Sequence, residues 1–331
     1  MVQQGYNIIN NKMKMIETNK PKEQSIAVKP FLKWAGGKSQ LLEELIRHLL
    51  PYLRGSPIID SYIEPFVGGG ALFFYLKSRY TIKHSFLFDI NRELVVGYKV
   101  VKNDHEKLIN LLQKIESEYL SKTDDERKEY YYRVRSTYNM QMEDFDYGNY
   151  TISWVERAAY LIFLNKTCYN GLFRQNKRGE FNVPFGRYKN PTICERDTLI
   201  KAHIALADTE IFCADFTASG KYIKKGSLVY LDPPYLPISR TSSFTSYSKE
   251  NFAEKDQIRL AKFFENMDKK GAYLMLSNSD PKNEDPSNDF FDQLYKKYFI
   301  DRVQANRAIN CKGNKRGLIN ELIITNYKIG E

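Results

Sequence analysis

Cysteine, histidine and tryptophan are scarce in this chain of 331 residues, with four, four and two copies. The cysteines (Cys168, Cys194, Cys213 and Cys311) form no C-x-x-C pair and have no histidine at ligand spacing. This pattern argues against a disulfide framework and a structural zinc site, so we expect no bound metal. The absence of a Ser–His or Cys–His signature leaves nucleophilic hydrolysis without support.

Long apolar runs are also missing. No run approaches the roughly 18 residues that a membrane-spanning helix needs. The N-terminal residues lack the apolar segment of a signal peptide. We therefore expect a cytoplasmic protein that has no contact with a membrane.

Basic residues, in contrast, are in excess. Fifty Lys and Arg against 40 Asp and Glu give a formal net charge of +10. Such a balance favours a polyanionic partner, although charge alone indicates only non-specific attraction. The hydrophobic fraction of 42% suffices for a packed core, and the length fits one large or two moderate domains.

The pattern of apolar residues divides the chain into regions. Residues 1–29 are polar and lysine-rich, and we interpret them as a mobile basic arm. Short apolar strands alternate with helices in 30–91 and 196–331, which is typical of an α/β fold with an open, mostly parallel sheet. Residues 92–195 begin with long amphipathic helices and have no clear strand before about 168, so they predict an inserted helical domain. A β-hairpin is expected near 168–189.

A glycine turn follows the first predicted strand. Gly68, Gly69 and Gly70 allow the backbone to approach a ligand closely, and Asp89 ends the next strand about twenty residues on, where a carboxylate can bind ribose hydroxyls. This pair indicates an adenosine-bearing cofactor. Phe73 stands where a dinucleotide-binding loop would need its third glycine. The alternative is a tight turn without a ligand.

The tetrapeptide Asp232-Pro233-Pro234-Tyr235 follows another apolar strand, at the same edge of the sheet. A carboxylate, a carbonyl from a rigid Pro-Pro turn and an aromatic ring suit a flat base that carries an exocyclic amine. Accepting both amino hydrogens would aim the nitrogen lone pair at an electrophile. Without the other motifs, the tetrapeptide would be interpreted only as the start of a loop. Residues 277–280 follow a strand at this edge and are expected to line the pocket or cap a helix.

Basic and aromatic residues alternate in 166–189, where six Lys and Arg face a single acidic residue, Glu180. Guanidinium groups can read guanine in the major groove, and lysines can neutralise phosphates. Arg174 is the strongest candidate for base reading. The alternative interpretation of this segment is an ordinary solvated surface.

Four motifs in this order resemble the Dam-type DNA adenine N6-methyltransferases of the D12 class, which methylate adenine in GATC. The motifs occupy residues 31–38, 64–70, 165–188 and 232–235, and the resemblance spans roughly residues 31–325. It implies a Rossmann-like methyltransferase fold in which 92–195 is the target-recognition domain. It also implies S-adenosylmethionine as cofactor and double-stranded DNA as partner, with the adenine flipped out of the duplex.

The resemblance also implies roles for particular residues. Catalysis would fall to Asp232, Pro233 and Tyr235. The cofactor would be bound by Trp34, Lys38, Glu64, Phe66, Gly68, Gly70, Asp89, Asp215 and Asp232. DNA would be bound by Lys33, Tyr169, Asn170, Leu172, Arg174, Asn176, Pro184, Arg187 and Tyr188.

The expected protein is thus an adenine-specific DNA methyltransferase that works as a monomer. The sequence leaves open whether it protects DNA against a partner restriction endonuclease acting on the same site or acts alone. Two alternatives remain open at this point. One is a methyltransferase for an amine or amide of RNA or protein, although relatives of that kind tend to begin the tetrapeptide with Asn. The other is a DNA-binding relative that has lost catalysis.

Overall fold

The computed structural model describes residues 28–34, 36, 38, 41–54, 56–235, 252–306 and 318–329. The predicted basic arm lies outside these residues except for its last two, Val28 and Lys29. None of the described helices is both long enough and apolar enough to cross a membrane.

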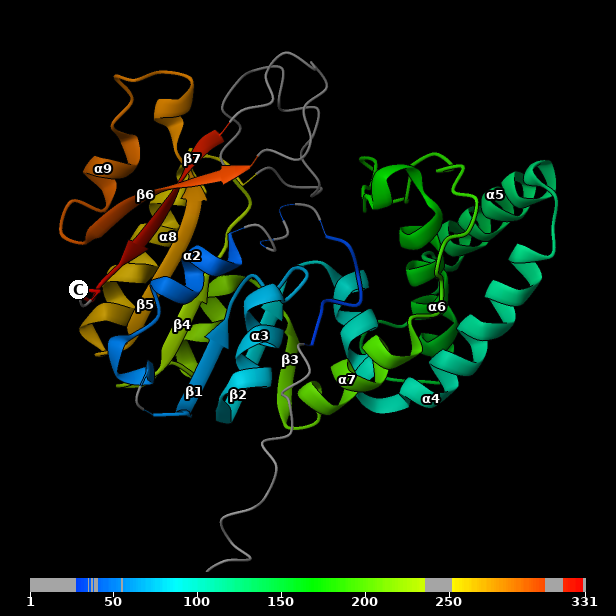
Figure 1. Cartoon of the computed structure of the whole chain (residues 1–331), viewed down its shortest axis with the longest axis horizontal. Coiled ribbons are helices and arrows are strands. Elements are labelled where there is room, and N and C mark those ends of the chain that lie inside the picture. Colours follow the sequence, from blue (N-terminus) through cyan, green and yellow to red (C-terminus); the bar gives the residue numbers. More distant parts are fainter. Residues whose placement is uncertain are drawn as a thin grey trace, which may run out of the picture.

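A seven-stranded sheet, in the order β3-β2-β1-β4-β5-β7-β6, forms the centre of the described structure (Figure 1). Strands β3, β2, β1, β4 and β5 are parallel, whereas β7 is antiparallel to both β5 and β6. The strands are β1 (Ile58–Glu64), β2 (Thr81–Asp89), β3 (Thr209–Cys213), β4 (Leu228–Leu231), β5 (Tyr273–Ser279), β6 (Phe299–Asn306) and β7 (Leu318–Thr325). The predicted α/β class with a mostly parallel sheet is confirmed.

Helices cover both faces of the sheet, and each face buries its own apolar cluster. One cluster includes side chains of α2, α3, α4 and α7, and the other includes side chains of α8 and α9. The helices of this part are α2 (Leu42–Arg47), α3 (Ala71–Arg79), α7 (Arg196–Leu206), α8 (Glu254–Lys269) and α9 (Phe290–Leu294), with short 3-10 helices η1 (Pro51–Arg54), η3 (Phe216–Lys221) and η5 (Pro281–Asn283).

Three long helices, α4 (Arg92–Leu120), α5 (Asp124–Gln141) and α6 (Ser153–Thr167), extend to one side of the sheet (Figure 1). Helix α4 begins directly after β2 because the Asn91 side chain caps it, accepting from the amides of Glu93 and Leu94 at 3.0 and 3.2 Å. A residue with non-helical backbone angles, Asp104, kinks α4. Its N-terminal part packs against the sheet, and α4 also packs extensively on α6.

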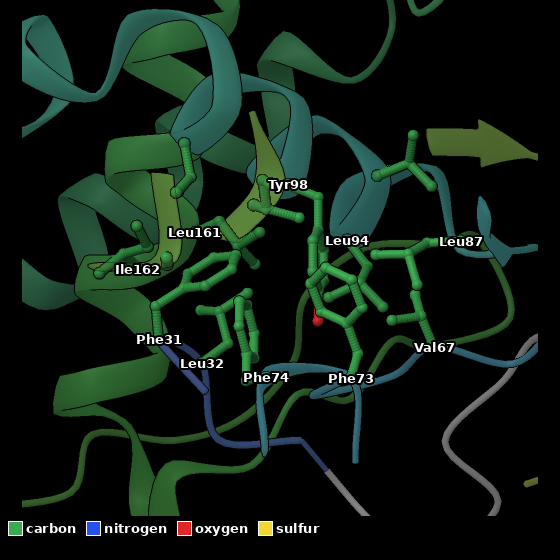
Figure 2. Packing of buried hydrophobic residues seen from close by; sticks show 14 of the residues in the cluster. Phe31, Leu32, Val67, Phe73, Phe74, Leu87, Leu94, Tyr98, Leu161 and Ile162 are labelled. Carbon is green, nitrogen blue, oxygen red and sulfur yellow. The ribbon is translucent and has the colours of Figure 1, made fainter. Parts of the chain in front are cut away.

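The motif at 31–34 is anchored between the sheet and these helices. Phe31 and Leu32 are 2% and 4% exposed, and Figure 2 shows them among side chains of α3, α4 and α6. The Phe31 ring meets the Tyr98 ring edge-on at 5.1 Å between centroids. The adjoining Lys33 and Trp34 are therefore held at the border between the two parts of the fold.

The segment 168–189 doubles back on itself, with a 3-10 turn, η2 (Tyr169–Gly171), at its base. Two isolated antiparallel bridges join its arms, Cys168 with Phe185 and Gln175 with Phe181, in place of continuous strands. Near the base of the segment, Asn170 and Arg187 adopt positive φ angles of 58° and 55°. We call residues 168–189 the recognition segment below.

Candidate active site and nucleic-acid interface

The carboxyl ends of β1 and β4 lie next to each other at the point where the strand order reverses. Residues Tyr62 and Ile63 of β1 pair with Leu228 and Val229 of β4. Such a switch point is where open α/β sheets bind their ligands. The glycine turn that follows β1 and the acidic tetrapeptide that follows β4 therefore meet at one edge.

Glycine is required at two positions of the turn. Gly68 and Gly70 have φ angles of 48° and 69°, and a Cβ on Gly70 would lie 2.5 Å from the Tyr98 hydroxyl. The turn is fastened to the neighbouring strand by the Gly68 amide, which donates to Asp89 Oδ2 at 3.1 Å. The backbone of the turn can consequently approach a ligand without a side chain in the way.

Asp89 lies at the end of β2 beside this turn. Its Oδ1 accepts from the Asn91 amide at 2.8 Å. Burial raises the pKa of this carboxyl to about 6, and the hydrogen bonds from Asn91 and Gly68 limit the rise. Asp89 is thus placed and poised to accept hydrogen bonds from a ligand at the sheet edge.

Glu64 faces the core below the turn. It is 2% exposed and accepts a hydrogen bond from the Tyr62 hydroxyl at 2.7 Å. Burial raises the pKa of Glu64 well above its usual range. The Glu64 side chain is thus fixed by its own strand, directly before the turn.

An aromatic cluster lies beyond the turn. The rings of Phe66 and Phe216 stack at 5.3 Å, and Phe252 meets Phe66 edge-on at 5.7 Å. The Asp215 carboxylate caps η3 through the Thr217 amide and binds the Arg259 guanidinium, with oxygen-to-nitrogen distances of 3.0 and 2.9 Å. Phe216 and Phe252 were not predicted from the sequence, because isolated apolar residues have no periodic signal.

This combination fits an adenosine-bearing cofactor. The half-buried Phe66 ring, backed by the buried Phe216 ring, offers an apolar surface for a base. Asp89 offers a carboxylate for ribose hydroxyls, and the glycine turn leaves its backbone open to approach. In the part of the chain that the structure describes, no three Cys, His, Asp or Glu side chains gather as a metal site.

Asp232 is the centre of the second half of the site. Its Oδ1 lies 2.9 Å from Lys38 Nζ and accepts from the Ser277 hydroxyl at 3.0 Å. Burial raises the pKa of Asp232, while Lys38 and Ser277 act in the opposite direction because they stabilise the ionised form. Polar residues at the end of β5 thus lie beside the tetrapeptide.

Tyr235 contributes an aromatic wall. Lys38 Nζ lies 3.9 Å from the centroid of its ring, and its hydroxyl donates to Glu321 of β7. The ammonium of Lys38 therefore bridges the Asp232 carboxylate and the Tyr235 ring. The resemblance predicted Lys38 in the cofactor site. In the structure, its ammonium group pairs with the Asp232 carboxylate, the predicted catalytic group.

The Pro-Pro turn is braced from behind. Gln257 of α8 donates to the Pro234 carbonyl at 3.3 Å, and Asn278 donates to Gln257 Oε1 at 3.0 Å. Both amides are fully buried. Gln257 and Glu321 were missed from the sequence because they come from elements far from any motif. Residues 236–251, which continue the tetrapeptide, lie outside the described part.

The recognition segment exposes aromatic residues at its base. Tyr169 and Tyr188 are 55% and 37% exposed, next to the positive-φ residues Asn170 and Arg187. The Tyr169 amide donates to the Pro184 carbonyl at 2.8 Å, which joins the two arms. Leu172 packs against the core at the inner side of this base.

Toward the tip, polar side chains hold the segment in shape. Arg174 Nε donates to Asn182 Oδ1 at 2.8 Å. The Asn176 carboxamide oxygen accepts from the amides of Arg178 and Glu180 at 2.9 and 3.1 Å, which closes the turn. One edge of the Arg174 guanidinium is thus fixed and the group is oriented by its neighbour.

A doubly wound sheet whose glycine turn and acidic tetrapeptide meet at its switch point is the arrangement of α/β enzymes that bind nucleotide-like cofactors. Comparison with known proteins narrows the class. Residues 34–309 match the family model for D12 class N6 adenine-specific DNA methyltransferase. The chain belongs to this family.

Curated relatives cover nearly all of the chain. It is 50% identical over 301 residues to type II methyltransferase M.MjaIII of Methanocaldococcus jannaschii, covering 91% of this chain and 99% of the relative. It is 38% identical over 317 residues to type II methyltransferase M1.LlaDCHI of Lactococcus lactis, covering 95% and 99%. The DNA adenine methylase of Escherichia coli K12 is 33% identical over 301 residues, covering 91% and 95%.

Proposed function

We propose that this DNA adenine methyltransferase transfers the methyl group of S-adenosylmethionine to N6 of adenine in the sequence GATC. The observation that carries the proposal is the Asp232 carboxylate beside the Tyr235 ring, at the switch point that also holds the glycine turn. The block at 165–188, which resembles the recognition hairpin of family members that methylate GATC, supports the choice of GATC.

The proposed cofactor site uses residues of three strand ends. Asp89 accepts the ribose hydroxyls, and the Phe66 ring, which Phe216 supports from the core, contacts the adenine ring beside Asp215. The Gly68 and Gly70 turn leaves space for the cofactor chain, with Trp34, Lys38 and Glu64 completing its surroundings. When bound, S-adenosylmethionine supplies an electrophilic methyl group on a sulfonium, so no covalent enzyme intermediate is required.

The proposed catalytic role belongs to the tetrapeptide. Asp232 and the Pro233 carbonyl accept the two hydrogens of the adenine amine, and Tyr235 stacks on the base. Taking both hydrogens withdraws the nitrogen lone pair from conjugation and directs it at the methyl group. Because adenine N6 is paired inside a duplex, the base must swing out to reach this pocket.

The proposed DNA interface is the recognition segment together with Lys33, within a target-recognition domain over residues 92–195. Arg174 reads guanine, and the exposed Tyr169 and Tyr188 fill the space that the flipped base vacates. Further contacts come from Asn170, Leu172, Asn176, Pro184 and Arg187. We propose that the enzyme acts as a monomer.

We further propose that this enzyme protects GATC sites against a restriction endonuclease, which does not form a stable complex with it. The names of two relatives, both type II methyltransferases, support this role. The prediction is that DNA from cells expressing the chain resists an endonuclease that cuts unmodified GATC.

One incubation tests the main proposal. The protein is mixed with S-adenosylmethionine labelled in its methyl group and with matched duplexes that contain or lack GATC. Label is expected in the GATC duplex alone, at adenine N6 after nucleoside digestion. Equal labelling of both duplexes would contradict the specificity. Labelling of RNA or protein instead of DNA would select the first alternative, and no labelling would select the silent relative.

A further inference from the structure

A buried asparagine joins the motif at 31–34 to the recognition segment. Asn165, near the end of α6, is 1% exposed. Its Oδ1 accepts from the Lys33 amide at 2.9 Å, while its Nδ2 donates to the Lys33 carbonyl at 2.8 Å and to the Gly171 carbonyl at 3.2 Å. One carboxamide thus fixes the backbone of both segments through three bonds.

Trp34, the next residue, lies between the glycine turn and the recognition segment. Its ring stacks on Phe173 at 4.8 Å between centroids, with an interplanar angle of 20°. On its other side, a Cβ placed on Gly68 would lie 3.1 Å from Trp34 Cδ1. A shift of the Trp34 ring would therefore disturb the packing of both the proposed cofactor turn and the proposed DNA-reading segment.

The side chain of Lys33 crosses the same junction. A Cβ on Gly171 would lie 2.6 Å from Lys33 Cδ, and Gly171 has a φ of +63°. Only glycine leaves room there for the lysine stem. The backbone that Asn165 fixes therefore also sets where the Lys33 ammonium is presented beside the recognition segment.

We propose that Asn165 is a positioning residue that couples cofactor binding to recognition of the DNA site. By fixing the Lys33 backbone, it holds the neighbouring Trp34 indole where both the glycine turn and Phe173 can pack against it. This inference rests on the proposed function, because it takes the two segments as the cofactor and DNA sites. Coupling between sites is reciprocal, so each ligand tightens the other by the same factor.

The test measures that factor by binding instead of by turnover. The affinity for a fluorescent GATC duplex is determined with and without S-adenosylhomocysteine, the methyl-free product. The wild-type protein is expected to bind the duplex about tenfold more tightly with the nucleoside, within the usual range of coupling. In Asn165→Asp the two donated bonds are replaced by a carboxylate facing two carbonyls, and the factor is expected to fall to within about twofold of one.

Asn139 provides a matched control. Its carboxamide also pairs with one residue in both directions, accepting from the Phe181 amide at 2.9 Å and donating to the Phe181 carbonyl at 3.1 Å. It fixes the recognition segment to α5 but contacts neither Lys33 nor Trp34. Asn139→Asp is expected to keep the wild-type coupling factor whatever happens to its affinity for DNA.

A second variant keeps the inference testable if Asn165→Asp unfolds. Phe173→Leu removes the ring that stacks on Trp34, and it is expected to reduce the coupling factor at least threefold. Circular dichroism shows whether both variants keep the native fold. Full coupling in both variants, or equal loss in Asn139→Asp, would overturn the inference. A wild-type protein that methylates no GATC would instead contradict the proposed function, and the coupling factor can still be measured on that protein.

Discussion

Two regions of this molecule hold an ion pair with a buried cation, and they differ in how the carboxylate is surrounded. In the helical region, Glu93 and Arg157 are each 1% exposed and meet through two bonds of 2.7 Å. Glu93 also accepts from the hydroxyls of Tyr138 and Tyr147, and Arg157 donates to the Tyr138 carbonyl. Every side of this pair is occupied.

The pair at the sheet edge is open by comparison. Asp232 receives Lys38 and Ser277 on the same oxygen, Oδ1, and among the described residues no partner contacts its Oδ2. The Asp232 side chain is also 19% exposed, so its Oδ2 is accessible to a donor from a ligand. The contrast separates a pair that fixes structure from one that is available for chemistry, and each prediction below tests this distinction.

The largest effect is expected at the open pair. Asp232→Asn removes the acceptor charge but keeps the shape, so methyl transfer should fall at least about a thousandfold. Binding of cofactor and of DNA should persist. Single-turnover labelling of a GATC duplex measures the loss. Asp208→Asn serves as control, because the Asp208 side chain is 61% exposed and pairs with Lys77 away from the site. Near-normal turnover in Asp232→Asn would remove the proposed role.

Breaking the Glu93–Arg157 pair should lower the folding stability. Arg157→Leu leaves Glu93 buried without its cation, which should lower the free energy of unfolding by about 3–5 kcal/mol. Urea denaturation measures the change. Arg133, whose side chain is 65% exposed and lies 3.7 Å from Glu118, provides the control, because Arg133→Leu should cost less than about 0.5 kcal/mol. An equal loss of unfolding free energy in both variants would show that the Glu93–Arg157 pair has no special structural role.

Base reading should show a smaller effect. Arg174→Ala should narrow the affinity gap between a GATC duplex and one with a single changed pair by about 1–3 kcal/mol. Lys177→Ala, in the same segment, should weaken binding to both duplexes alike because phosphate contacts carry no sequence information. Fluorescence anisotropy at fixed salt measures both. A uniform loss in Arg174→Ala would assign it to the phosphates.

The smallest effect concerns pH. Because burial raises the pKa of Asp89 to about 6, its contribution to folding stability is greatest at low pH and is lost as pH rises through 6. The ionised fraction of Asp89, which we propose as the acceptor of the ribose hydroxyls, grows over the same pH window. Affinity for S-adenosylmethionine should therefore be about tenfold lower at pH 5 than at pH 7.5. Calorimetry should show that the affinity of Asp89→Asn for S-adenosylmethionine does not change with pH. If the affinity of this variant depends on pH as that of the wild type does, another group is responsible.

Much of the site followed from sequence because its parts stand at strand ends. An apolar run followed by Gly68 or by Asp232 indicates a strand and its carboxyl edge, and parallel strands bring such edges together. The partners of these residues were not predictable. Gln257 and Glu321 come from elements without a motif, and Glu93 and Arg157 are 64 residues apart in sequence.

The sequence by itself determined the class of the fold, the turn that only glycine can form and the chemistry of the tetrapeptide, since these depend on local backbone freedom and side-chain type. Only the tertiary structure decided that Lys38 lies on Asp232 and Tyr235, and that Asn165 fastens Lys33 to Gly171. Such contacts depend on how helices pack on the sheet, and the packing of distant segments is set by the whole core rather than by any single motif.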